Sequence, residues 1–95
     1  MKKNYTYSFE EDLQKRLQNP EFKKIWDEEA LERELGSLVI GLRIKFKMSQ
    51  RALAKKLKTS QAAVCRLELA EANPSLSFLK RLATAFGKKL VVEFR

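Results

Sequence analysis

The chain has 95 residues, enough for one small domain with an additional arm, and a net charge of +8. No apolar run approaches the roughly 18 residues of a membrane helix, and the first residues lack the apolar centre of a signal peptide, so a cytoplasmic protein is expected. The single cysteine excludes an internal disulfide bond, and the absence of histidine argues against a zinc site and removes the commonest general base. We therefore expect neither an enzyme nor a bound cofactor.

The charge is divided unevenly along the chain. Residues 1–38 carry seven Lys/Arg against nine Asp/Glu, a net charge of −2, whereas residues 39–95 carry thirteen against three, a net charge of +10. Nucleic acid is the expected partner of the C-terminal part, because each phosphate that a basic residue neutralises releases counterions and so favours binding. The alternative is that this basic surface is only solvated. The two parts are therefore expected to face different partners.

The first segment predicts an arm and a short helix. Residues 1–7 are polar, with tyrosines at alternate positions, and Ser8 followed by Glu11 is a capping-box pattern. The apolar residues of this helix form one narrow stripe: Phe9, Leu13 and Leu17. Because proline disfavours a helical conformation in the residue before it, the helix is expected to end at Asn19-Pro20. The next helix then begins there, with Asn19 as its cap and Pro20 in its first position.

The helical pattern that begins at Pro20 continues to about Phe46 and carries two apolar stripes near opposite sides. One stripe consists of Phe22, Ile25 and Trp26, and the other of Leu31, Leu35, Leu38, Leu42 and Phe46. A straight helix cannot bury both in one small core, so either the chain bends near 34–36 or one stripe meets a partner. The first stripe is either covered by the preceding helix or joins it in a partner-binding surface.

Residues 48–77 predict two short helices, each preceded by a serine that can cap it, Ser49 and Ser60. The apolar positions face one way on each helix: Leu53, Ala54 and Leu57 on the first, Val64 and Leu67 on the second. This layout is typical of a helix-turn-helix, in which the second helix enters the major groove of DNA.

The outer face of the second helix, about 61–69, holds the candidate base contacts. Gln61 can pair with adenine, Arg66 with guanine, and the methyl group of Ala62 can touch thymine. Gln50, at the start of the preceding helix, is expected to contact phosphate, and further DNA contacts are predicted at Lys58, Ser60 and Asn73. Cys65 shares this face and is expected to be inert, since no histidine can activate it.

The C-terminal part predicts a last helix, which follows Asn73-Pro74 and is capped by a serine, and a short strand. Leu76, Leu79, Leu82, Ala83 and Phe86 have helical spacing and are expected to close the core, with Gly87 as the helix stop. In residues 90–95 the side chains alternate between two faces, as in a β-strand: Leu90, Val92 and Phe94 on one face, Val91 and Glu93 on the other. A lone strand leaves its backbone groups unpaired, so it needs a partner from a second subunit, another protein or residues 4–7.

Residues between about 38 and 87 match the pattern of a known repressor family: Leu42-Arg43, Ser49-Gln50, Leu53-Ala54, Ser60-Gln61, Val64, Arg66-Leu67-Glu68, Pro74-Ser75, Leu82-Ala83 and Phe86-Gly87. The segment resembles the Cro/C1-type repressors, also called the XRE family. The resemblance implies that Arg43 and Glu68 form a structural ion pair between two helices; a DNA-contacting role is the alternative. Lys47, Lys58 and the pair Leu69-Ala70 depart from positions where the family often has glycine, so these turns are expected to be strained or altered.

The flanking segments resemble HigA-type antitoxins of type II toxin–antitoxin pairs, through the N-terminal Ser-Phe-Glu-Glu helix, the Asn-Pro-Glu-Phe segment and the C-terminal strand. This resemblance implies a homodimer that binds a palindromic operator, represses its own operon and neutralises a RelE/HigB-like mRNA endonuclease, as a heterotetramer with two toxins. The expected toxin-binding residues are Phe9, Leu13, Leu17, Phe22, Ile25 and Trp26. The alternative is a phage- or plasmid-type repressor without a toxin.

The expected fold is mainly α-helical. It consists of an N-terminal arm and helices that bind the toxin (1–35), a repressor-like helix-turn-helix domain of four to five helices (36–89) and a C-terminal strand for pairing (90–95).

Overall fold

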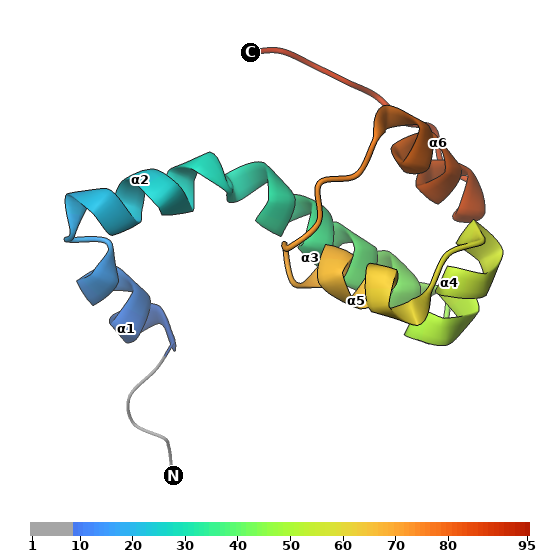
Figure 1. Cartoon of the computed structure of the whole chain (residues 1–95), viewed down its shortest axis with the longest axis horizontal. Helices are drawn as coiled ribbons and strands as arrows, with labels where there is room; N and C mark the ends of the chain where they lie inside the picture. The colour runs from blue at the N-terminus through green and yellow to red at the C-terminus, as the bar shows by residue number, and fades with distance from the viewer. Residues whose placement is uncertain (1–8) are drawn as a thin grey trace, which may run out of the picture. The chain divides into compact units, whose positions relative to one another are not determined.

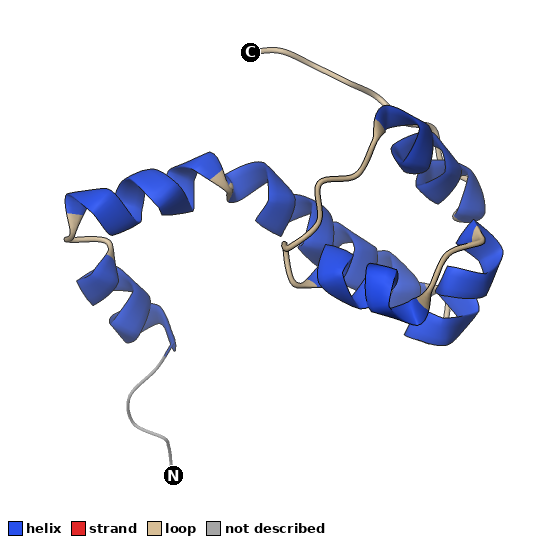
Figure 2. Cartoon of the chain, in the orientation of Figure 1, coloured by secondary structure: helices blue, strands red, loops and turns tan. Residues whose placement is uncertain are grey.

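Helices joined by short loops, without a β-strand, make up residues 9–95, the part of the chain that the computed structural model describes (Figures 1 and 2). The predicted arm and the predicted capping residue Ser8 lie outside these residues. The chain divides into two units after Ala30, and each is described here by itself. This division lies before the domain boundary expected from the sequence, which is after residue 35.

The N-terminal unit contains α1 (Phe9–Arg16) and α2 (Pro20–Glu28). The predicted cap between them is confirmed: the Asn19 side-chain oxygen accepts from the backbone N–H of Glu21 at 2.9 Å and of Phe22 at 3.4 Å, and Pro20 occupies the first helical turn. The rings of Phe22 and Trp26 stack at 6.0 Å between centroids. Neither helix contains a buried residue, so this unit has no core of its own among the described residues.

The long helical pattern from Pro20 forms two helices, because α3 (Ala30–Lys45) begins after a break at Glu29. At Glu29 the backbone leaves helical geometry, with φ −99° and ψ 12°. Of the two alternatives, a bend at 34–36 is wrong, since α3 continues through Gly36. This glycine is buried against α5 and serves close helix packing instead of ending the helix.

The C-terminal unit is completed by α4 (Gln50–Leu57), α5 (Gln61–Glu68) and α6 (Leu76–Ala85). Its core consists of Val39, Leu53, Ala54, Leu57, Val64, Leu67, Leu82 and Phe86. The predicted inner faces of α4 and α5 are therefore confirmed. Leu76 was expected in the core, but it is 55% exposed, because it lies in the first turn of α6 and faces a groove formed with the C-terminal segment. Leu31, Leu38 and Phe46 are also exposed, so the second predicted stripe is buried only in part.

Serine caps begin the last three helices, as predicted. The hydroxyl groups of Ser49, Ser60 and Ser75 accept from backbone N–H groups three residues later, at 3.0–3.1 Å. The turns that lack the family's glycines keep the left-handed conformation: φ is 56° at Lys47, 58° at Lys58 and 63° at Ala70. A side chain in this region costs about 1 kcal/mol, so these turns are strained.

The predicted C-terminal strand is absent from the described residues, where residues 88–95 form an extended loop (Figure 2). The physical reason is that a strand exists only through hydrogen bonds to a neighbour, and no described segment of this chain pairs with it. Three of its apolar side chains are well exposed: Val91, Val92 and Phe94, the last at 97%.

The two glycines of α3 are expected to respond in opposite ways to alanine. A Cβ at Gly36 would lie 2.8 Å from the carbonyl oxygen of Glu68 and 2.9 Å from that of Leu67, whereas one at Gly41 would meet nothing within 4 Å. Gly36→Ala should therefore lower the free energy of unfolding by about 2 kcal/mol, and Gly41→Ala should raise it by about 0.5–1 kcal/mol. Urea denaturation checks both, and equal effects of the two substitutions would show that α3 and α5 do not approach this closely.

Candidate DNA-binding surface

The helix-turn-helix consists of α4, a short turn and α5. The turn closes when Lys58 adopts the left-handed conformation and the backbone N–H of Thr59 donates to the carbonyl oxygen of Ala54 at 2.9 Å. The next residue, Ser60, caps α5 through Ala63. The angle between α4 and α5 is thus set by backbone bonds at the turn and by the buried side chains beneath it.

The outer face of α5 carries the side chains that the sequence assigns to DNA. Gln61, Ala62 and Arg66 are exposed, while Val64 and Leu67 on the opposite side are buried. Cys65 is half-buried and unoxidised. Gln61 and Arg66 therefore stand free to meet base edges when the helix lies in a groove, which is the geometry that base recognition requires.

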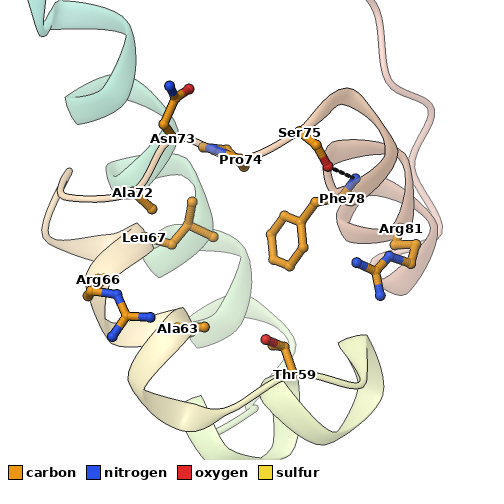
Figure 3. Close-up of a pocket in the computed structure, with 10 residues that line it drawn as sticks. All are labelled: Thr59, Ala63, Arg66, Leu67, Ala72, Asn73, Pro74, Ser75, Phe78 and Arg81. Carbon is orange, nitrogen blue, oxygen red and sulfur yellow. Dashed lines mark hydrogen bonds between the residues drawn. The ribbon is translucent and has the colours of Figure 1, made fainter.

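A cleft of about 280 Å³ opens beside this face, between α5, the following loop and α6 (Figure 3). Arg66 lines it from α5 and Asn73 from the loop, so it brings together two of the predicted DNA contacts. It also contains Arg81, which sequence reasoning missed. Arg81 donates from Nη1 to the carbonyl oxygen of Leu57 at 3.0 Å, and its guanidinium lies 5.3 Å from the centroid of Phe78.

An ion-pair network connects α3, α4 and α5 behind the recognition surface. The Glu68 carboxylate accepts from Arg43 Nε at 2.7 Å and Nη2 at 3.1 Å, and from Gln50 Nε2 at 2.9 Å. Arg43 Nη1 also donates to the carbonyl oxygen of Met48 at 3.1 Å. The side chains of Glu68 and Arg43 are only 5% and 19% exposed. Gln50, expected at a phosphate, thus has one of its two amide hydrogens committed to this network.

A helix-turn-helix family model matches residues 41–92, which is more than half of the chain. The chain belongs to the XRE-type helix-turn-helix family. Its members are DNA-binding transcriptional regulators, so this chain is a DNA-binding protein of that class. No curated protein and no solved structure matches the chain. None of the helices of residues 9–95 is long and apolar enough to cross a membrane.

The network of this XRE-type domain predicts a dependence of stability on pH. Burial alone raises the pKa of Glu68, but the hydrogen bonds from Arg43 and Gln50 and the charge of Arg43 together lower it below the ordinary glutamate value of 4.5. The ionised pair therefore stabilises the fold fully above that value, and this contribution is lost as the pH falls through the lower pKa of the folded state.

Glu68→Gln should make stability less dependent on pH as the pH falls below the ordinary glutamate pKa of 4.5, because its amide cannot ionise. Urea denaturation at several pH values checks this. Glu71→Gln, which alters an exposed carboxylate outside the network, is the matched control. The same acid sensitivity in Glu68→Gln and the wild type would contradict the stabilising role of the ionised carboxylate.

Proposed function

We propose that this regulator is the antitoxin of a type II toxin–antitoxin pair. In this proposal the C-terminal unit represses its own operon, and the N-terminal unit neutralises a RelE/HigB-like mRNA endonuclease by direct binding. The observation that carries the proposal is that α1 and α2 contain no fully buried residue: Phe9 and Ile25 are 70% and 54% exposed, and the other apolar side chains of these helices are half-buried. Exposed apolar side chains at helical spacing are the anchors by which amphipathic helices bind a partner's groove.

The charge of this unit supports a basic partner. Residues 9–30 carry seven Asp/Glu against four Lys/Arg, a net charge of −3, in a chain whose total is +8. Three of the acidic residues lie in the first turn of α1: Glu10, Glu11 and Asp12. Acidic groups around apolar anchors speed association with a basic protein and suppress wrong partners. The proposed anchors are Phe9, Leu13, Leu17, Phe22, Ile25 and Trp26.

On DNA, the exposed face of α5 supports the proposed base contacts: Gln61 to adenine, Arg66 to guanine and Ala62 to a thymine methyl group. Lys58, Ser60 and Asn73 are proposed to contact the backbone, as is Gln50 through its remaining amide hydrogen. We assign Arg43 and Glu68 to holding α3 against α5. A homodimer would place two α5 helices about 34 Å apart on a palindromic operator.

The homodimer and the complex with two toxins are part of the same proposal. The exposed apolar side chains of residues 91–94 support a role in pairing, because such a segment gains hydrogen bonds only when another strand lies beside it. Truncation after Lys89 followed by measurement of the mass in solution distinguishes the possible neighbours. A dimer that persists without these residues would exclude them as the main dimer contact.

Co-expression with the neighbouring gene tests the proposal. A short, basic product that stops growth alone, and that is tolerated and co-purified with this chain, is the expected result. A neighbouring product that is harmless, or that this chain fails to neutralise, would contradict the antitoxin role and leave a repressor of phage or plasmid type.

A further inference from the structure

The cleft beside α5 combines two guanidinium groups with an absence of carboxylates among its lining residues. Arg66 from α5 and Arg81 from α6 stand on opposite sides of it (Figure 3). Thr59 and Asn73 add polar groups, and Phe78 forms part of the apolar wall. A concave site lined by positive charge and without acidic residues favours an anion.

Arg81 is held in place for such a ligand. One of its five N–H groups donates to the carbonyl oxygen of Leu57, at the C-terminal end of α4, and the ring of Phe78 lies under its guanidinium. These contacts restrict the side chain while leaving most of its donors unused. A guanidinium whose position is already fixed loses less conformational entropy when it binds phosphate.

The position of the cleft identifies the anion. An α-helix is about 10–12 Å wide and the major groove about 12 Å, so a helix in the groove has one sugar-phosphate strand along each flank. On one flank of α5, Glu68 accepts a hydrogen bond from Gln50, the residue expected to contact a phosphate of one strand. On the other flank Ala63 and Arg66 border the cleft.

We propose that the cleft receives the phosphodiester backbone of the DNA strand opposite to the one met by Gln50, with Arg81 as its main phosphate contact. This proposal rests on DNA binding by the domain and is independent of the antitoxin role. It adds a backbone contact from the middle of α6, an element that lies outside the helix-turn-helix itself.

The test measures binding of the full chain to a random-sequence duplex of about 30 base pairs, a length of three helical turns, by fluorescence anisotropy over a range of KCl concentrations. Arg81→Gln removes the charge but keeps an N–H donor for Leu57. Asn73→Asp places a carboxylate in the cleft and leaves the contacts of Arg81 intact. Lys80→Gln is the matched control, because it changes the net charge equally but lines a separate groove on α6.

Arg81→Gln should reduce the slope of log K against log salt by about 0.9, the value for one phosphate contact, and weaken binding about tenfold. Arg81→Lys keeps the charge and should retain the slope, whereas a merely structural role of Arg81 would leave the slope of Arg81→Gln at the wild-type value as well. Asn73→Asp should bind more weakly than Lys80→Gln. A wild-type slope in Arg81→Gln, or equal affinities of Asn73→Asp and Lys80→Gln, would overturn the proposal. The assay contains no toxin, so failure of the antitoxin role would not affect it.

Discussion

Replacing Arg43 with methionine is expected to lower the free energy of unfolding by about 3 kcal/mol. The reason is that the Glu68 side chain, only 5% exposed beside Arg43, would lose its counter-charge and keep only the hydrogen bond from Gln50. Removing one partner of a buried pair typically costs about 3–5 kcal/mol. Urea denaturation of the purified variant checks this value. Arg51→Met, the same replacement at an exposed position of α4, should change stability by less than about 0.5 kcal/mol.

A double-mutant cycle separates the pair from the general loss of an arginine. Because Arg43→Met and Glu68→Leu each remove the same interaction, the double variant should be more stable than the sum of the two single effects predicts. Strict additivity of the two substitutions would show that the 2.7 Å contact between Arg43 Nε and Glu68 Oε2 contributes nothing to stability.

Trp26→Ala is expected to abolish neutralisation of the toxin while leaving DNA binding unchanged. Tryptophan side chains dominate protein interfaces, and their removal commonly costs 2 kcal/mol or more, roughly a thirtyfold loss of affinity. Trp26 stacks with Phe22, and α1 and α2 contain no buried residue, so its loss should not disturb the core formed within residues 39–86. The measurements are growth rescue in cells and the dissociation constant for the purified neighbouring gene product.

Ile44→Ala serves as the control for Trp26→Ala, because it removes an exposed apolar side chain from α3 in the C-terminal unit. It should neutralise the toxin as well as the wild type does. Full neutralisation by Trp26→Ala, or an equal loss in both variants, would place the toxin-binding surface elsewhere on the chain.

Local chemistry explains which parts of the DNA-binding unit could be predicted from the sequence. A serine cap depends on one residue and the backbone three positions later, so Ser49, Ser60 and Ser75 were identifiable without tertiary information. The inward and outward faces of α5 follow from helical spacing alone. Arg43 and Glu68 came from resemblance to a family, because nothing local connects two residues 25 positions apart.

The features that escaped prediction depend on contacts between distant parts of the chain. Gly36 lies in the segment where the sequence allowed a bend, but its missing side chain lets α3 approach the last carbonyl groups of α5. Arg81 contacts Leu57, 24 positions earlier, and no spacing rule indicates this. The C-terminal strand depends on a neighbouring strand, and residues 9–95 supply none, so its alternating pattern alone could not establish that it forms.

Hydrogen–deuterium exchange on the full chain tests most directly the claim that one unit binds the toxin and the other binds DNA. Exchange would be followed by mass spectrometry with the neighbouring gene product, and separately with DNA from upstream of the chain's own gene. The protein partner is expected to slow exchange in α1 and α2, and DNA is expected to slow exchange in α4 and α5. Protection by the protein partner confined to α4 and α5, with α1 and α2 unchanged, would contradict this claim.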